Sequence, residues 1–124
     1  MQKKEKIFLR FQPLRMTGSD PQWEDWNCYD NLLLVYQTDY NWLLMPYFEQ
    51  LFPIADPINK NIQDRMNVCF DNWIGKEDWQ RFFCFIKNDM QTMSEEVKNF
   101  YCELISWIEI ALNETEVIVV EGNL

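Results

Sequence analysis

The chain has 124 residues, of which 48% are hydrophobic and 16% aromatic, with 20 acidic side chains, 11 basic ones and no histidine. This length and composition predict a single globular domain over residues 1–124. The net charge of -9 argues against a nucleic-acid binder, which needs a basic face to neutralise phosphates, and against binding to an anionic membrane.

The first predicted elements are a short strand and a helix. Several β-forming side chains before Pro13 favour a strand over Lys6–Leu14. Asp20 followed by Pro21 is typical of a helix start, because the aspartate caps the first turn and the proline has no N–H to lose there. We therefore expect a first helix from Pro21 to about Thr38.

The next two predicted helices are delimited by prolines and a glycine. The second covers Asn41–Phe52, with Pro46 either kinking it or starting its regular part, and Pro53 ending it. The third starts at Asp56-Pro57 and continues to Gly75, a typical terminator. Its apolar face consists of side chains at helical spacing, namely Ile58, Ile62, Met66, Cys69, Phe70 and Trp73.

Two more helices and a strand complete the predicted fold. A fourth helix has apolar residues at helical spacing from Trp79 to Met90. Thr92 and Glu95 fit a capping box that opens a fifth helix to about Leu112, and Val117–Val120 reads as a strand. The sequence thus predicts a mainly α fold, with about five helices in a compact bundle, in which the N- and C-terminal strands could form a small β pairing.

The residue types that usually carry catalysis or bind metals are scarce. Without histidine there is no imidazole base or ligand, and the three glycines are too isolated to form a phosphate loop. The four cysteines are widely spaced beside apolar neighbours, which predicts buried free thiols and not nucleophiles. No apolar run resembles a signal peptide or a membrane span. We therefore expect a cytoplasmic protein that is not an enzyme and holds no cofactor or metal.

Two helix faces combine an apolar residue with surrounding acids. On the first helix, Trp23 lies opposite the core, close to acidic side chains. On the fifth helix, Glu95, Glu96, Glu103 and Glu109 lie opposite the core, with Ile110 among them and Lys98 as the only base. An apolar anchor ringed by acids is typical of a surface that docks a basic protein. A solvated face with a stray apolar residue is the alternative.

The connection over residues 37–42 mixes aromatic, amide and acidic side chains, and such connections often recognise partners. A helix cap followed by core rings is the alternative, which we favour for Trp42 but not for Tyr40. The predicted partner-binding residues are Trp23, Glu24, Asp25, Asp30, Asp39, Tyr40, Glu103 and Ile110.

In character the whole chain resembles bacterial immunity proteins of the colicin and contact-dependent growth-inhibition systems. The resemblance rests on the acids of residues 20–56, on the carboxylates from Glu95 to Glu121, and on the rings of Trp23, Trp26, Tyr29, Tyr40 and Trp42. It implies a protein that binds and neutralises a basic toxin by covering its active site or a neighbouring surface. A nuclease fits this partner, because its phosphate-binding cleft must be basic. The protein would be a monomer when free and a 1:1 heterodimer with the toxin.

Two other functions remain open at this point. An acidic nucleic-acid mimic would carry carboxylates in a row at phosphate-like spacing and occupy the basic groove of its target. A structural or adaptor protein would associate through its aromatic surface.

Overall fold

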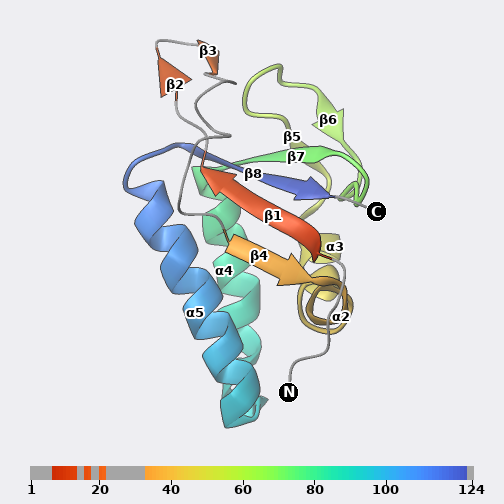
Figure 1. The fold of residues 1–124 in the computed structure, drawn as a ribbon, viewed down its shortest axis with the longest axis vertical. Coiled ribbons are helices and arrows are strands. Elements are labelled where there is room, and N and C mark those ends of the chain that lie inside the picture. The colour runs from red at the N-terminus through yellow and green to blue at the C-terminus, as the bar shows by residue number, and fades with distance from the viewer. Residues whose placement is uncertain (1–6, 14–15, 18–19, 22–32, 123–124) are drawn as a thin grey trace.

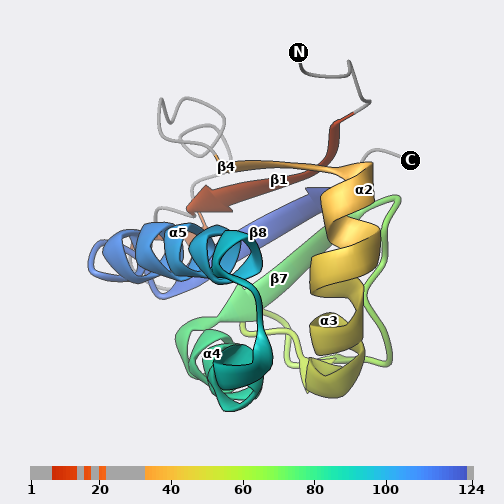
Figure 2. The ribbon, with the colours of Figure 1, turned by 90° about the horizontal axis from the view of Figure 1, so that it is seen from below.

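The computed structural model describes residues 7–13, 16–17, 20–21 and 33–122, and these residues form a mixed α/β fold (Figure 1). A four-stranded antiparallel sheet packs its inner face against the helices (Figure 2). The expectation of a five-helix bundle is therefore wrong. In chain order the sheet strands are β1 (Ile7–Pro13), β4 (Leu33–Tyr36), β7 (Asp71–Gly75) and β8 (Val117–Gly122).

The strand order in this sheet is β4-β1-β8-β7. The N-terminal strand β1 does pair with the C-terminal strand β8, as Phe11 opposite Val120 illustrates, but the two form the centre of the sheet. On its other edge β1 pairs with β4, and β8 pairs with β7. Two short antiparallel pairs lie outside this sheet: β2 (Met16–Thr17) with β3 (Asp20–Pro21), and β5 (Ile54–Ala55) with β6 (Ile62–Gln63).

Strand β4 occupies part of the predicted first helix. Residues 33–36 are extended and pair with β1, with Val35 buried on the helical side of the sheet. Asp20 and Pro21, which were expected to start the helix, belong to β3. Residues 22–32 lie outside the described residues. The apolar run from Leu33 to Tyr36 suits either a strand or a helix, and the long-range pairing with β1 decides between them.

The second predicted helix is confirmed and begins four residues earlier than expected. It runs continuously as α2 (Gln37–Asp39), a π-helical turn (Tyr40–Leu44) and α3 (Met45–Leu51), here called helix 37–51. Pro46 stands in the first turn of α3, directly after the π-helical turn, and so begins the regular α-helical part.

The fourth and fifth predicted helices are also confirmed, as α4 (Lys76–Asp89) and α5 (Glu95–Leu112), joined by a 3-10 turn (Met90–Thr92). Trp79, Phe82 and Ile86 of α4 are completely buried, as their helical spacing predicts. The cap of α5 is Ser94 and not Thr92, because the Ser94 hydroxyl accepts a hydrogen bond from the backbone N–H of Val97.

The third predicted helix, over residues 57–75, is wrong. Asp56 does not cap a helix, since its carboxylate accepts hydrogen bonds from the N–H groups of Ile58 and Asn59 in a tight turn. Lys60 in this turn has a left-handed backbone, with φ of 67°. Aspartate and asparagine side chains compete with the helix for backbone donors, and here they close the β5–β6 hairpin.

A cluster of aromatic rings joins the helices to one another. The ring of Phe48 lies 4.6 Å from that of Phe82 and 6.2 Å from that of Trp79, measured between centroids. Two hydroxyls add links between helices: Tyr47 donates to the Asp89 carboxylate at 2.8 Å, and Tyr101 donates to the Leu43 carbonyl at 2.6 Å. The core thus fixes helix 37–51 against both α4 and α5.

Candidate functional site

The outward side of α5 carries a stripe of glutamates, which we call the acidic face. Glu96, Glu103 and Ile110 follow one another at seven-residue intervals, so they lie nearly in line along the helix. The acidic face is made of exposed side chains, namely Glu95, Glu96, Glu103, Glu109 and Ile110. Ile110 is 59% exposed, which is high for a large aliphatic side chain.

Helix α5 contains one base, Lys98, whose ammonium lies 3.8 Å from the carboxylate of Glu95. A surface ion pair at this distance contributes little to stability. With four glutamates against one lysine, the helix has a net charge of -3. The neighbouring α4 has three basic and three acidic residues, and its Arg81 pairs with Asp78 at 2.9 Å. The negative charge of α5 therefore contrasts with the neutral α4, while helix 37–51 carries a net charge of -2 from Asp39 and Glu49.

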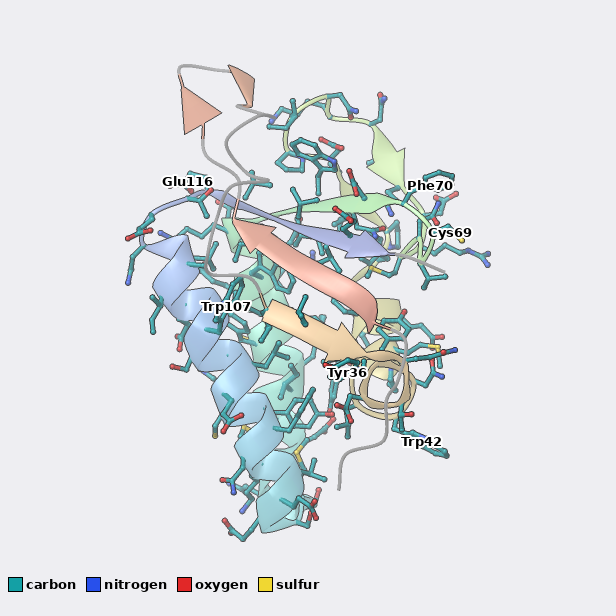
Figure 3. All side chains as sticks on the ribbon, viewed as in Figure 1. Tyr36, Trp42, Cys69, Phe70, Trp107 and Glu116 are labelled. Atoms are coloured by element: carbon teal, nitrogen blue, oxygen red, sulfur yellow. The ribbon has the colours of Figure 1, made fainter. Side chains whose placement is uncertain are left out.

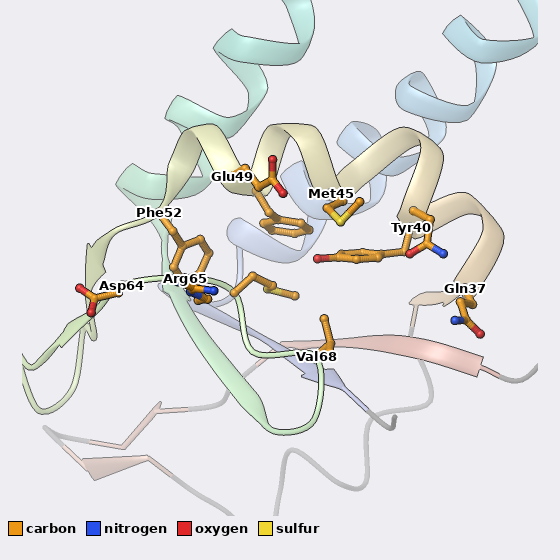
Figure 4. A pocket seen from close by; sticks show the side chains of 11 residues that line it. Gln37, Tyr40, Met45, Glu49, Phe52, Asp64, Arg65 and Val68 are labelled. Carbon is orange, nitrogen blue, oxygen red and sulfur yellow. The ribbon is translucent and has the colours of Figure 1, made fainter.

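A second feature is a pocket of about 530 Å³ between helix 37–51 and the loop that follows β6 (Figure 4). The helix side provides Gln37, Tyr40, Asn41, Met45, Phe48 and Glu49, followed by Phe52 just beyond α3. The loop side provides Asp64, Arg65, Met66 and Val68. The pocket therefore combines aromatic and aliphatic walls with a few polar groups, as ligand-binding pockets commonly do.

The aromatic wall of the pocket belongs to the buried core. Tyr40 stacks on Phe48 with centroids 6.2 Å apart, and Phe48 meets Phe52 edge-on at 6.4 Å. Burial, and then the negative charge of Glu49, raise the pKa of Tyr40 to about 12. The phenol of Tyr40 is therefore neutral at physiological pH and keeps its hydroxyl proton.

The opposite wall is shaped by Asn72, a completely buried polar residue of β7. Its amide nitrogen donates to three carbonyls, those of Asn67, Phe70 and Val120. Its amide oxygen accepts hydrogen bonds from the Gln63 side chain and the Asn67 backbone N–H. The bonds to Asn67 and Phe70 tie the loop over residues 64–70 to the sheet, because the buried Asn72 amide would lose these partners if the loop moved away.

Glycine at position 122 is required for the same loop to approach the sheet. A Cβ at Gly122 would overlap the backbone carbonyl of Val68. The N–H of Gly122 also donates to the Phe70 carbonyl at 3.1 Å, which extends the ladder past β7. The loop wall of the pocket is therefore held at both of its ends.

Large apolar side chains are exposed on helix 37–51 and on the loop over residues 64–70. Trp42, in the π-helical turn, is 78% exposed, and Phe70 is 68% exposed (Figure 3). We expected Trp42 in the core and counted Phe70 on the inner face of the third helix, so both expectations are wrong. No sequence signal distinguished these rings from core rings, because their exposure follows from a π turn and a loop that periodicity does not predict.

The predicted partner-binding residues fall into separate places. Trp23, Glu24, Asp25 and Asp30 lie outside the described residues. Tyr40 is 4% exposed and lines the pocket, so its expected place in an exposed connection is wrong, while Asp39 is half-buried in α2. Glu103 and Ile110 are exposed on α5, and neither lines the pocket beside helix 37–51.

The cysteines also differ from expectation. Cys69, Cys84 and Cys102 are free thiols, but all three are exposed and not buried. Cys28 lies outside the described residues. In the part of the chain that the structure describes, no three cysteine, aspartate or glutamate side chains gather as they would around a metal ion. No helix within that part is long and apolar enough to cross a membrane.

No protein-family model, curated protein or solved structure matches the chain.

Proposed function

We propose that this protein binds a basic protein and neutralises it, as an immunity protein neutralises a nuclease toxin. The observation that carries the proposal is the acidic face of α5, where exposed glutamates lie along the same side of the helix as the exposed Ile110. In the complex this face covers the basic active-site cleft of the toxin or a surface beside it, and so blocks nucleic acid from entering.

Charge and apolar contact have separate roles in this binding. The net charge of -3 on α5 attracts a basic surface over about a Debye length and speeds the encounter. Ile110 then contributes affinity when the partner removes it from water, since buried apolar anchors dominate binding energy. Lys98 lies at the N-terminal end of α5, so its charge does not interrupt the region around Glu103, Glu109 and Ile110.

The spacing of the carboxylates favours a protein-docking face over a nucleic-acid mimic. Glu96 and Glu103 are seven residues apart, which corresponds to about 10 Å along a helix. A nucleic-acid strand carries one phosphate per ~3.4 Å of its axis. Exposed neutral residues, among them Asn99 and Ser106, separate the glutamates. An apolar residue within the face has no counterpart in a phosphate backbone either.

A cytoplasmic location forms part of the proposal. Three exposed cysteines remain as free thiols. Exposed thiols persist in the reducing cytoplasm, whereas secreted proteins usually oxidise them. An immunity protein would meet an incoming nuclease in that compartment.

The test is capture of the partner by tagged protein from cells that produce the chain, at low and at high salt. We expect a basic protein that degrades nucleic acid, with degradation stopped by stoichiometric wild-type protein. Glu103→Lys should weaken capture by about tenfold or more, because it places like charges opposite each other in the interface. The matched control is Glu77→Lys, which makes the same charge change on the exposed side of α4.

The result separates the proposal from its alternatives. Equal capture by Glu103→Lys and Glu77→Lys would exclude the acidic face from the interface. Capture of nothing but a second copy of the chain would favour a structural or adaptor role. Capture of a nuclease that stays fully active would leave binding without neutralisation and would contradict the inhibitory function.

A further inference from the structure

The pocket between helix 37–51 and loop 64–70 is separate from the acidic face of α5. Phe48, Phe52 and Tyr40 form its aromatic wall, and each is less than 10% exposed although each borders the pocket. Met45, at 37% exposure, lies at the mouth. The volume of about 530 Å³ falls in the range typical of ligand pockets.

The walls of the pocket are formed before any ligand arrives. Asn72 and Gly122 hold the loop wall against the sheet, as described above. Helix 37–51 is fixed through the Tyr101 hydroxyl, which donates to the Leu43 carbonyl. Preformed walls lower the ordering cost of binding, so even a single side chain can gain affinity there.

The charges at the pocket indicate what kind of partner it suits. Glu49 and Asp64 contribute two carboxylates, and Arg65 contributes one guanidinium. None of the ion pairs seen among the described residues involves these three side chains. The polar part of the pocket therefore has a net charge of -1, which favours a ligand with a cation beside its apolar part.

We propose that the pocket binds a bulky apolar side chain on an extended segment of a partner protein, with a neighbouring lysine or arginine placed near Glu49 or Asp64. The assignment of this segment to the basic toxin rests on the proposed function. The preference of the pocket for an apolar side chain beside a cation is independent of that function. The aromatic wall contacts the apolar side chain, and the amides of Gln37 and Asn41 are within the pocket to bond the peptide backbone.

The exposed ring of Trp42 extends this binding surface. Trp42 lies one residue after Asn41 and three residues before Met45, both of which line the pocket. It projects from the helix into solvent at 78% exposure (Figure 3). Exposed tryptophans beside a pocket are typical of interface hot spots. π-helical turns such as the one that carries Trp42 occur frequently at functional sites.

The proposal can be tested on the isolated protein with three blocked dipeptides. Acetyl-phenylalanyl-lysine amide should cause saturable shifts of the backbone amide resonances of Met45, Met66 and Val68 in ¹H–¹⁵N spectra. Acetyl-alanyl-lysine amide should bind at least about tenfold more weakly, because it buries no ring. Acetyl-phenylalanyl-glutamate amide should bind about threefold more weakly than the lysine compound, because its charge is reversed.

Two variants locate the binding. Met45→Arg places a long cation at the mouth of the pocket and should abolish the shifts. Ile62→Arg is the matched control, since Ile62 is 67% exposed and does not line the pocket, and it should bind as the wild type does. Non-saturable shifts, equal binding of the alanine compound, or equal loss in both variants would overturn the proposal.

Failure here can be distinguished from failure of the proposed function. The dipeptide measurement needs no partner, so a negative result contradicts the binding role of the pocket and does not affect the proposed role of α5. If the dipeptide binds but no nuclease is captured, the proposed toxin partner is contradicted and the pocket still acts as a peptide-binding site.

Discussion

The acidic face of α5 and the pocket under helix 37–51 are both candidate binding surfaces, but they are built differently. The acidic face lies on one regular helix, and its members are set by their spacing in the sequence. The pocket combines a π-helical turn, a loop and residues up to 31 positions apart in the chain, from Gln37 to Val68. Charge placed on a single helix can therefore be deduced from sequence, whereas a cavity depends on how separate segments pack.

The difference also affects how each surface tolerates change. The glutamates of α5 are exposed and can be exchanged with little effect on folding. The pocket shares Phe48 and Tyr40 with the core, so its shape and the stability of the protein are coupled. Four measurements test this contrast.

The largest effect is expected from Phe48→Ala. Phe48 is completely buried and contacts the rings of Tyr40, Phe52, Trp79 and Phe82. Its truncation should lower the free energy of unfolding by about 3–5 kcal/mol. Phe70→Ala is the control, because Phe70 is 68% exposed, and it should change stability by less than about 0.5 kcal/mol in urea unfolding. Equal effects would contradict the placement of the two rings.

Asn72→Ala tests whether the loop wall depends on one buried amide. The variant should lose about 2–3 kcal/mol of stability, since several buried groups are left without partners. Hydrogen exchange of the amides of Asn67 and Gly122 should accelerate more than that of α5. Asn61→Ala, an exposed change in the β5–β6 turn, should have almost no effect. Unchanged exchange in the Asn72 variant would mean that the loop is held in another way.

High pH tests the link between the two regions. Burial, and then the charge of Asp89, raise the pKa of Tyr101 to about 12, and Tyr40 is raised to the same value. In the unfolded chain both phenols titrate near ~10. The free energy of unfolding that comes from keeping these phenols protonated is therefore complete below about pH 10, and it is lost as the pH rises from 10 to 12. Urea unfolding across this range should show falling stability.

The variant Tyr101→Phe serves as the comparison in that experiment. It removes the hydrogen bond to the Leu43 carbonyl, which should cost about 1 kcal/mol at pH 7. It also removes one of the titrating groups, so its stability should fall less steeply between pH 10 and 12. A wild-type stability that stays constant to pH 12 would show that these phenols are not buried.

The smallest effect is expected at the start of α5. Ser94→Ala removes the cap of the helix and should cost about 1 kcal/mol. Thr92→Ala, at the position that the sequence favoured as the cap, should cost less, because the Thr92 hydroxyl bonds only the Asp89 carbonyl. Thermal unfolding of the two variants side by side gives the comparison. A larger loss of stability for Thr92→Ala than for Ser94→Ala would indicate that Thr92 caps the helix.

Helical periodicity predicted α4 and α5 correctly and the helix over residues 57–75 wrongly, for a physical reason. The apolar residues of α4 and α5 recur at helical spacing, and both helices are present. Residues 58–73 show the same spacing, yet Ile62 and Phe70 are mostly exposed. Asp56, just before that segment, and Asn67, within it, accept hydrogen bonds from nearby backbone N–H groups and favour turns over a helix.

The candidate binding surfaces also differ in how far the sequence could predict them. The exposure of Glu103 and Ile110 on α5 followed from their positions opposite the apolar side of one helix. The pocket could not be predicted, because Tyr40 and Val68 meet only after β7 and β8 bring the loop under helix 37–51. Asn72 gave no signal, since a buried asparagine and a surface asparagine are identical in sequence.

The sequence by itself determined the negative charge, the lack of histidine chemistry, the terminal strands, helices α4 and α5, and the acidic stripe on α5. These properties depend on composition or on neighbours within a few residues, where side-chain chemistry and backbone geometry are directly coupled. The tertiary structure decided that the chain forms a four-stranded sheet, that Trp42 faces solvent, and that a pocket opens beside it. These outcomes depend on pairing and packing between distant segments, whose free energies no local pattern contains.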